Sequence, residues 1–278
     1  MKFSAGEAAF EGFRVTRQHP RAVAGWTLIW LVSLIATALT ALPILGPVMG
    51  ELQDAMRTAM SGGGSGLPAA IQSRVTYAML ATMPVSLVTQ AIVMPALYRA
   101  MQSEVRDPFA FVRLGRDELR VLLVLLLLAI ISVVLGQVGD TAVLATQGVN
   151  LSFVGALIGI ATTALNLFVA VRMVLAVPAT FSRGRIDLKG AWRLTEGRFW
   201  PLFGMAIIAG VMACIVGLLL LIVSLPLSAM MAGAATSPAG AAGALLVLLL
   251  MAVGAALVTI ILSAPFMAAY RDLTAGQD

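Results

Sequence analysis

The sequence has few of the residues from which catalytic and metal sites are built. It holds one histidine, His19, and one cysteine, Cys214, among 278 residues. A single cysteine excludes an intrachain disulfide and a thiolate metal site of the usual four-ligand kind. Paired-histidine metal motifs and a Ser-His-Asp triad need histidine inside a constellation, whereas His19 precedes a proline in a basic segment. We therefore predict no catalytic residues, no metal site and no cofactor.

Charged residues are also scarce, which indicates a membrane protein. Only 11% of the residues are charged and 60% are hydrophobic, whereas a soluble domain has about 25% and about 45–50%. So few charges could not cover the exterior of a soluble protein of this size, and lipid must be part of its solvent. The net charge of +5 would ordinarily suggest nucleic-acid binding. Here the basic residues occupy short segments between apolar runs, which favours a membrane surface and no nucleic acid.

Six apolar runs are long enough to be transmembrane helices, since a helix needs about 20 apolar residues to cross the hydrocarbon. The first run is too long for the core of a secretory signal, which has about 7–15 residues. We predict an all-α polytopic membrane protein with a single six-helix domain over residues 1–278. Its spans lie at about Val23–Pro43, Tyr77–Tyr98, Val121–Leu144, Leu151–Val177, Leu202–Met231 and Ala244–Tyr270.

The basic residues divide unequally between the segments that join these runs. Fifteen of the eighteen lysines and arginines lie in residues 1–22, 99–120 and 183–198 and at Arg271, and two lie in the other connecting segments. Because cytoplasmic loops collect lysine and arginine, we predict that both termini are cytoplasmic. Residues 50–75 then form the longest outer loop, in which residues 61–66 are a flexible Gly/Ser link and Pro68 opens the second span.

The spans fall into three similar units of approximately residues 1–99, 100–183 and 184–271. Each unit has an amphipathic segment, an outgoing helix and a return helix that ends in a proline, an aromatic residue and an arginine. Arg14, Arg113 and Arg193 become equivalent positions. We predict three related hairpins; transporters often contain such repeats, but a structural bundle could also arise by duplicating a hairpin.

Aromatic residues are interleaved with the arginines of the amphipathic segments. Rings favour the headgroup level of a bilayer, and arginine favours the anionic leaflet beside it. We predict that each segment forms a short helix lying in the interface, with Arg14, Arg113 and Arg193 beside anionic lipid headgroups. The carboxylates of these segments are expected to be local charge partners of the arginines.

The return helices carry small and polar residues at spacings of three or four, which places them on one face. Gly155 and Gly159 have the GxxxG spacing that lets helices approach closely. Two interpretations remain open. These faces either pack, with Gln90 and Asn166 bonded across helices, or line a hydrated path or headgroup cavity at the bundle centre.

Arg172 is the one basic residue inside an apolar run. An intramembrane cation is a functional hypothesis by default. Arg172 nevertheless lies only six residues before Pro178, about 9 Å along a helix, so its side chain can reach the cytoplasmic leaflet. It either snorkels or pairs structurally, or it holds a lipid phosphate or an anionic substrate.

Residues 191–203, Ala-Trp-Arg-Leu-Thr-Glu-Gly-Arg-Phe-Trp-Pro-Leu-Phe, follow a Leu-Ala-Val-Pro sequence that ends at Pro178, and the closing Ala264–Tyr270 has a similar pattern. These stretches resemble the membrane domain associated with glycerophosphoryl diester phosphodiesterases, as found alone in six-helix bacterial membrane proteins. The resemblance implies a module of the bacterial inner membrane. The family's phosphodiesterase activity resides in a separate soluble barrel, for which this chain has no room, so no catalytic residue carries over.

Three functional hypotheses follow from the sequence. The leading one is a non-enzymatic inner-membrane scaffold or a module that handles lipids or a partner. Its partners would be anionic membrane lipids and a membrane protein or a second copy of the chain. The alternative is a small-solute or lipid transporter or channel. A membrane-embedded enzyme ranks third, because it would have to work with Arg172, Asn166 and Gln90 and no histidine.

Overall fold

The computed structural model describes residues 10–61, 68–103, 107, 109–147, 152–230 and 237–275. These residues are almost entirely helical, and no strand occurs among them. Six helical stretches are long and apolar enough to cross a membrane, which confirms the all-α class and is what a multi-pass membrane protein requires. They are Pro20–Thr58, Ala70–Gln102, Arg116–Thr146, Phe153–Arg183, Phe199–Leu227 and Pro238–Ala275.

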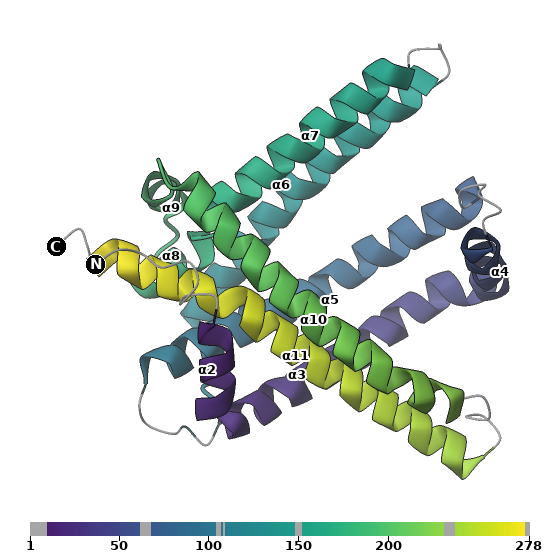
Figure 1. Cartoon of the computed structure of the whole chain (residues 1–278), viewed down its shortest axis with the longest axis horizontal. Helices are drawn as coiled ribbons and strands as arrows, with labels where there is room; N and C mark the ends of the chain where they lie inside the picture. Colours follow the sequence, from purple (N-terminus) through teal and green to yellow (C-terminus); the bar gives the residue numbers. More distant parts are fainter. Residues whose placement is uncertain are drawn as a thin grey trace.

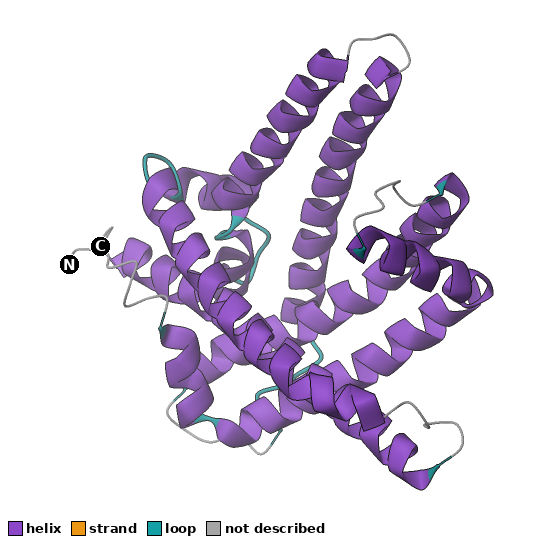
Figure 2. Ribbon diagram, turned by 45° about the vertical axis from the view of Figure 1, so that its right-hand side comes forward, coloured by secondary structure: helices purple, strands orange, loops and turns teal. Residues whose placement is uncertain are grey.

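The long helices pack in pairs of chain neighbours, α3 with α5, α6 with α7 and α10 with α11. The three pairs converge at one end of the molecule and diverge toward the other (Figures 1 and 2). We call the converging end the base; it contains α2, α8, α9 and the C-terminal ends of α5 and α11. The elements are α2 (Glu11–Gln18), α3 (Pro20–Leu45), η1 (Gly46–Val48), α4 (Met49–Met60), α5 (Ala69–Gln102), α6 (Arg116–Gln147), α7 (Ser152–Met173), α8 (Ala176–Arg183), α9 (Leu188–Leu194), α10 (Phe199–Met230) and α11 (Pro238–Ala275).

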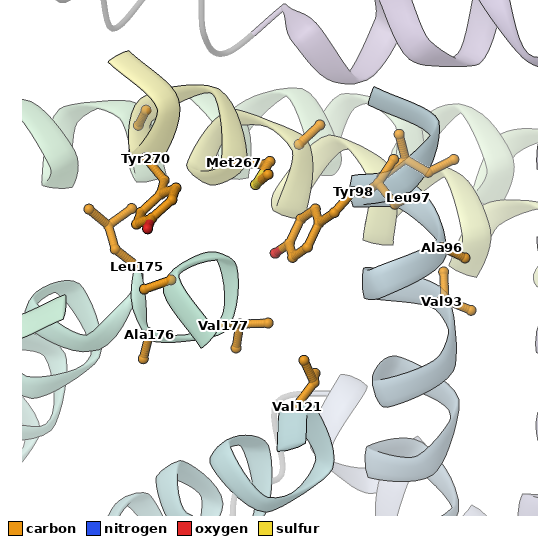
Figure 3. Packing of buried hydrophobic residues seen from close by; sticks show 14 of the residues in the cluster. Val93, Ala96, Leu97, Tyr98, Val121, Leu175, Ala176, Val177, Met267 and Tyr270 are labelled. Atoms are coloured by element: carbon orange, nitrogen blue, oxygen red, sulfur yellow. The ribbon is translucent and has the colours of Figure 1, made fainter. Parts of the chain in front are cut away.

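The base holds most of the buried core. Tyr98 of α5, Val177 of α8 and Met267 of α11 meet there, with Tyr270 and Leu175 beside them (Figure 3). Wholly buried alanines occur on each of the return segments, which allows their backbones to approach closely. Lipid is as apolar as a protein core, so close packing rather than removal from water holds helices together in a bilayer. The base is therefore the part of the fold that positions the rest.

The segment between the first two spans is more helical than the sequence suggested. Residues 50–75 were expected to be a loop, but residues 49–60 form helix α4, which follows directly on α3 and η1. Pro68 is the residue before α5 rather than its first helical residue. Residues 62–67, which make up most of the predicted Gly/Ser link, lie outside the described residues.

The fourth predicted span is not one continuous helix. Helix α7 ends at Met173, Val174 and Leu175 form a turn, and α8 begins at Ala176. Pro178 has no N–H to donate to the carbonyl of Val174, so the helical ladder is interrupted four residues before the proline. The next donor, the Ala179 N–H, bonds the Leu175 carbonyl at 2.9 Å and restarts the helix.

The segment before α6 departs from the predicted interfacial helix. Residues 109–115 are turns and irregular backbone, and Ala110 and Phe111 have φ values of 55° and 61°. Two buried donors hold this conformation. The Trp26 indole N–H bonds the Ala110 carbonyl at 2.9 Å, and the Arg99 guanidinium bonds the Phe111 carbonyl at 3.2 Å. The prediction of a short helix is therefore wrong for this segment, because tertiary hydrogen bonds override its helical pattern.

Helix α2 packs against another helix. Its Gly12 faces the backbone of α11 so closely that a Cβ atom there would lie 2.9 Å from the Cα of Ile261. Val15, one turn later on the same face, is buried. Only glycine permits this approach, so α2 is docked on α11 through its small-residue face while Arg14 and Arg17 remain exposed on the other.

Candidate functional site

The Arg172 side chain contacts α9. Its guanidinium lies over the Trp192 ring at 4.5 Å and near the Phe168 ring at 6.0 Å. One guanidinium nitrogen is 3.5 Å from the Thr195 hydroxyl, and that hydroxyl donates to the backbone carbonyl of Arg172 at 3.0 Å. The cation is thus held between two rings and a hydroxyl, and it links α7 to α9. We call Arg172, Phe168, Trp192 and Thr195 the Arg172 clasp.

Replacing Arg172 with leucine should lower the free energy of unfolding by about 1–2 kcal/mol, because a partly desolvated cation–π contact is worth that much. Arg193→Leu removes the same charge from the exposed side of α9 and should change the value by less than about 0.5 kcal/mol. Unfolding of the detergent-solubilised protein in increasing SDS measures both. Equal losses for the two variants would show that the clasp contributes nothing beyond general charge.

Asn166 and Gln90, the polar candidates inside the spans, lie apart from Arg172 and from each other. The amide nitrogen of Asn166 on α7 donates to the Ser132 hydroxyl on α6 at 3.1 Å. The same hydroxyl lies 3.2 Å from the Asn166 amide oxygen, to which it can donate. Gln90 on α5 is half-buried and has no hydrogen-bond partner among the described residues. Its neighbour Thr89 is buried and donates to the Ser33 hydroxyl on α3 at 2.8 Å. These contacts each tie one chain-neighbour pair of helices together.

The three arginines predicted to be equivalent are exposed on separate elements. Arg14 lies on α2 with 65% of its side chain exposed, and it pairs with Glu11 at 2.9 Å. Arg113 lies in the irregular segment with 71% exposed, and it approaches Asp107 at 3.8 Å. Arg193 lies on α9. Their charges are therefore accessible at the base, as headgroup contacts require, but they do not share one local conformation.

A largely buried ion cluster at the base was not among the predicted sites. The Arg99 guanidinium at the end of α5 lies 2.7 Å from Glu118 and 3.6 Å from Asp117, both in the first turn of α6. It also stacks over the Phe181 ring at 5.5 Å. The carboxylates were expected to be local charge partners of the arginines, whereas Glu118 and Asp117 join α6 to the end of α5. The available signal was an acidic pair at a helix start, because Glu118 also accepts the Gly115 N–H at 2.9 Å as an N-terminal cap.

A second carboxylate organises the turn between α8 and α9. Asp187 accepts the Gly190 N–H at 2.8 Å and pairs with Arg183. The backbone hydrogen bond, reinforced by that cation, holds the pKa of the Asp187 carboxyl below its usual range. The charged carboxylate caps the start of α9, the helix that carries Trp192 and Arg193. Within the described ranges, no three His, Cys, Asp or Glu side chains are grouped as a metal site.

Comparison with known proteins gives no relative for this chain. No protein-family model, no curated protein and no solved structure matches it. The resemblance to the membrane domain of glycerophosphoryl diester phosphodiesterases therefore stays a prediction.

Proposed function

We propose that this chain is a non-enzymatic module of a bacterial inner membrane, which organises or handles lipids or a membrane partner. The observation that carries the proposal is that polar side chains in the spans and exposed charged or aromatic side chains at the base occupy different parts of the fold. Two polar side chains within the spans bond the neighbouring helix, Asn166 to Ser132 and Thr89 to Ser33. Exposed arginines and aromatic rings gather instead on the elements of the base.

In the same proposal the base faces the cytoplasm. Thirteen basic residues among those the structure describes lie on the elements of the base, at the start of α3 or α6, or in the segments that join them, and cytoplasmic surfaces of membrane proteins collect such residues. Exposed rings lie among them, including Phe109 at 79% and Trp200 at 75% exposure. Rings at the headgroup level beside arginines favour contact with the anionic leaflet.

We also carry forward the three-unit repeat as part of this proposal. Each long pair of helices would be one unit, with α2, the segment before α6 and α9 as the three entry segments. The chain would then resemble the membrane domain that accompanies glycerophosphoryl diester phosphodiesterases. That likeness, rather than any active-site geometry, is the reason to place it in an inner membrane.

Transport is the second candidate function, and one feature favours it. A pocket of about 550 Å³ lies along α6 and α7, lined among others by Asp140, Thr162, Thr163 and Asn166. Glycines bring these helices together, since a Cβ on Gly139 would overlap the Thr162 hydroxyl. A polar groove on a membrane-length hairpin is one way in which a solute path could begin.

Reconstitution in liposomes separates these functions. The scaffold proposal predicts that liposomes holding the purified chain leak small anions, cations and sugars no faster than protein-free liposomes. It also predicts that they exchange fluorescent phospholipids between leaflets no faster. Solute flux or lipid scrambling that Asn166→Leu abolishes would instead establish the transporter function and reject the scaffold.

A further inference from the structure

The base contains a polar pocket that joins Arg14, one of the predicted headgroup residues, to polar residues that were not candidates. It has a volume of about 560 Å³ and lies between α2 and the C-terminal ends of α5 and α11. Its polar lining consists of Arg14, Gln18, His19, Gln102, Ser103 and Arg271. The three elements that form it are far apart in sequence, so the pocket exists only in the folded chain.

Packing of α2 on α11 directs two of these side chains into the pocket. The Gly12 and Val15 face of α2 is buried against α11. Arg14 and Gln18 are one turn apart on a neighbouring, exposed face of α2, because residues separated by four lie one above the other. His19 ends α2, and its ring is fixed edge-on against Phe111 at 5.6 Å.

Arg271 joins the second and third elements. It donates to the Met101 carbonyl at 3.2 Å and so links α11 to the end of α5. That carbonyl belongs to the last turn of α5, where exposed carbonyls carry partial negative charge. The contact gives the Met101 carbonyl a hydrogen-bond donor and holds the Arg271 guanidinium at the wall of the pocket.

The lining is suited to an anion. It contains two guanidinium groups, an imidazole and two side-chain amides, and it contains no carboxylate. Glu11 pairs with Arg14 from outside the lining at 2.9 Å, so one edge of that guanidinium is engaged. Arginine presents several N–H donors in a planar fork, which matches the oxygens of a phosphate.

We propose that this pocket binds the phosphate of an anionic phospholipid headgroup. The proposal rests on the lipid-handling function above, and it names the site and the chemistry of the ligand. The pocket adjoins the ends of two membrane-length helices, α5 and α11, where a bilayer places its headgroups. Phe10 and Phe13, at the start of α2 beside it, are 55% and 40% exposed, as expected of rings that rest among lipids.

The test uses the full chain in a neutral detergent and calorimetric titration with short-chain lipids. Dihexanoyl phosphatidylglycerol should bind saturably with one site per chain, whereas zwitterionic dihexanoyl phosphatidylcholine should bind at least about tenfold more weakly. The double variant Arg14→Gln/Arg271→Gln should weaken phosphatidylglycerol binding at least about tenfold, because it removes two charged hydrogen-bond donors. Arg57→Gln removes an exposed charge from α4, at the other end of the bundle, and should leave binding unchanged.

Each result decides the proposal. Equal affinity for the two lipids, unchanged binding in the double variant, or an equal loss in Arg57→Gln would overturn it. If the double variant does not fold, Arg14→Gln alone should weaken binding at least about threefold, and Arg14→Lys should lose less. Inorganic phosphate that binds as tightly as the lipid would identify a free phosphate site and reject the lipid. Liposome scrambling would reject the scaffold function while leaving this binding result unaffected, so the two failures are distinguishable.

Discussion

Replacing Arg99 with methionine should lower the free energy of unfolding by about 3–5 kcal/mol, the usual cost of breaking a buried ion pair from one side. Only 15% of the Arg99 side chain and 7% of the Glu118 side chain are exposed. The variant would leave the Glu118 carboxylate buried without its cation and the Phe111 carbonyl without a donor. Because Arg99 is on α5 and Glu118 is on α6, the attachment of the α6–α7 pair to the base should loosen.

SDS titration of the detergent-solubilised protein measures this loss, and a second variant isolates the ion pair. Arg99→Met/Glu118→Met should recover part of the stability, because no uncompensated buried charge remains. The exposed pair of Arg57 and Asp54 is the matched control, with atoms 3.8 Å apart and side chains about four-fifths exposed. Arg57→Met should change stability by less than about 0.5 kcal/mol. A similar loss in Arg57→Met, or no loss in Arg99→Met, would show that the cluster does not hold the base together.

Replacing Trp26 with alanine should also lower the free energy of unfolding by about 3–5 kcal/mol, as expected for a large aromatic side chain removed from a packed core. Trp26 is wholly buried, and its indole holds the left-handed backbone at Ala110. Close packing of Gly25 against the Ala110 methyl keeps α3 against the same segment. Loss of the indole should therefore both open a cavity and free the strained residues Ala110 and Phe111.

Trp26→Phe separates the two contributions. It keeps most of the ring but removes the N–H, so it should cost about 1–3 kcal/mol, the penalty for an unpaired buried carbonyl. Trp200→Ala, at a position 75% exposed, should stay within about 0.5 kcal/mol of the wild type. Limited proteolysis after Phe109 and Phe111 should accelerate in Trp26→Ala and not in Trp200→Ala. Unchanged cleavage in Trp26→Ala would contradict the role assigned to the indole.

The membrane-length helices were predictable because they depend on composition alone. Runs of about 20 apolar residues have few structural options in lipid, and each of the six predicted spans lies largely within an observed helical stretch. The predicted helix bounds are wrong where polar or tertiary contacts determine the backbone conformation. Residues 49–60 form helix α4 where the sequence predicted a loop, and the interruption at Val174 depends on one missing N–H at Pro178.

The candidate residues were harder to predict than the fold, because their partners come from distant elements. Arg172 was identified as exceptional, but the sequence could not show that Trp192 and Thr195 of α9 would surround it. In the sequence Arg99 is one of several basic residues in its segment, and only the fold shows that Glu118 of α6 lies against it. The left-handed backbone at residues 110 and 111 was not predictable, because neither residue is a glycine or an asparagine. Pairing across helices is set by how backbones approach, and a single sequence contains that information only weakly.

Cysteine accessibility tests most directly whether the base faces the cytoplasm. In a Cys214→Ala background, Ser61→Cys places a thiol at an exposed position after α4, and Ala275→Cys places one at the exposed end of α11. An impermeant maleimide should label Ser61→Cys in intact cells and label Ala275→Cys only after the cells are lysed. Labelling of Ala275→Cys in intact cells, with Ser61→Cys protected until lysis, would place the base and its arginines on the outer side and contradict the proposal.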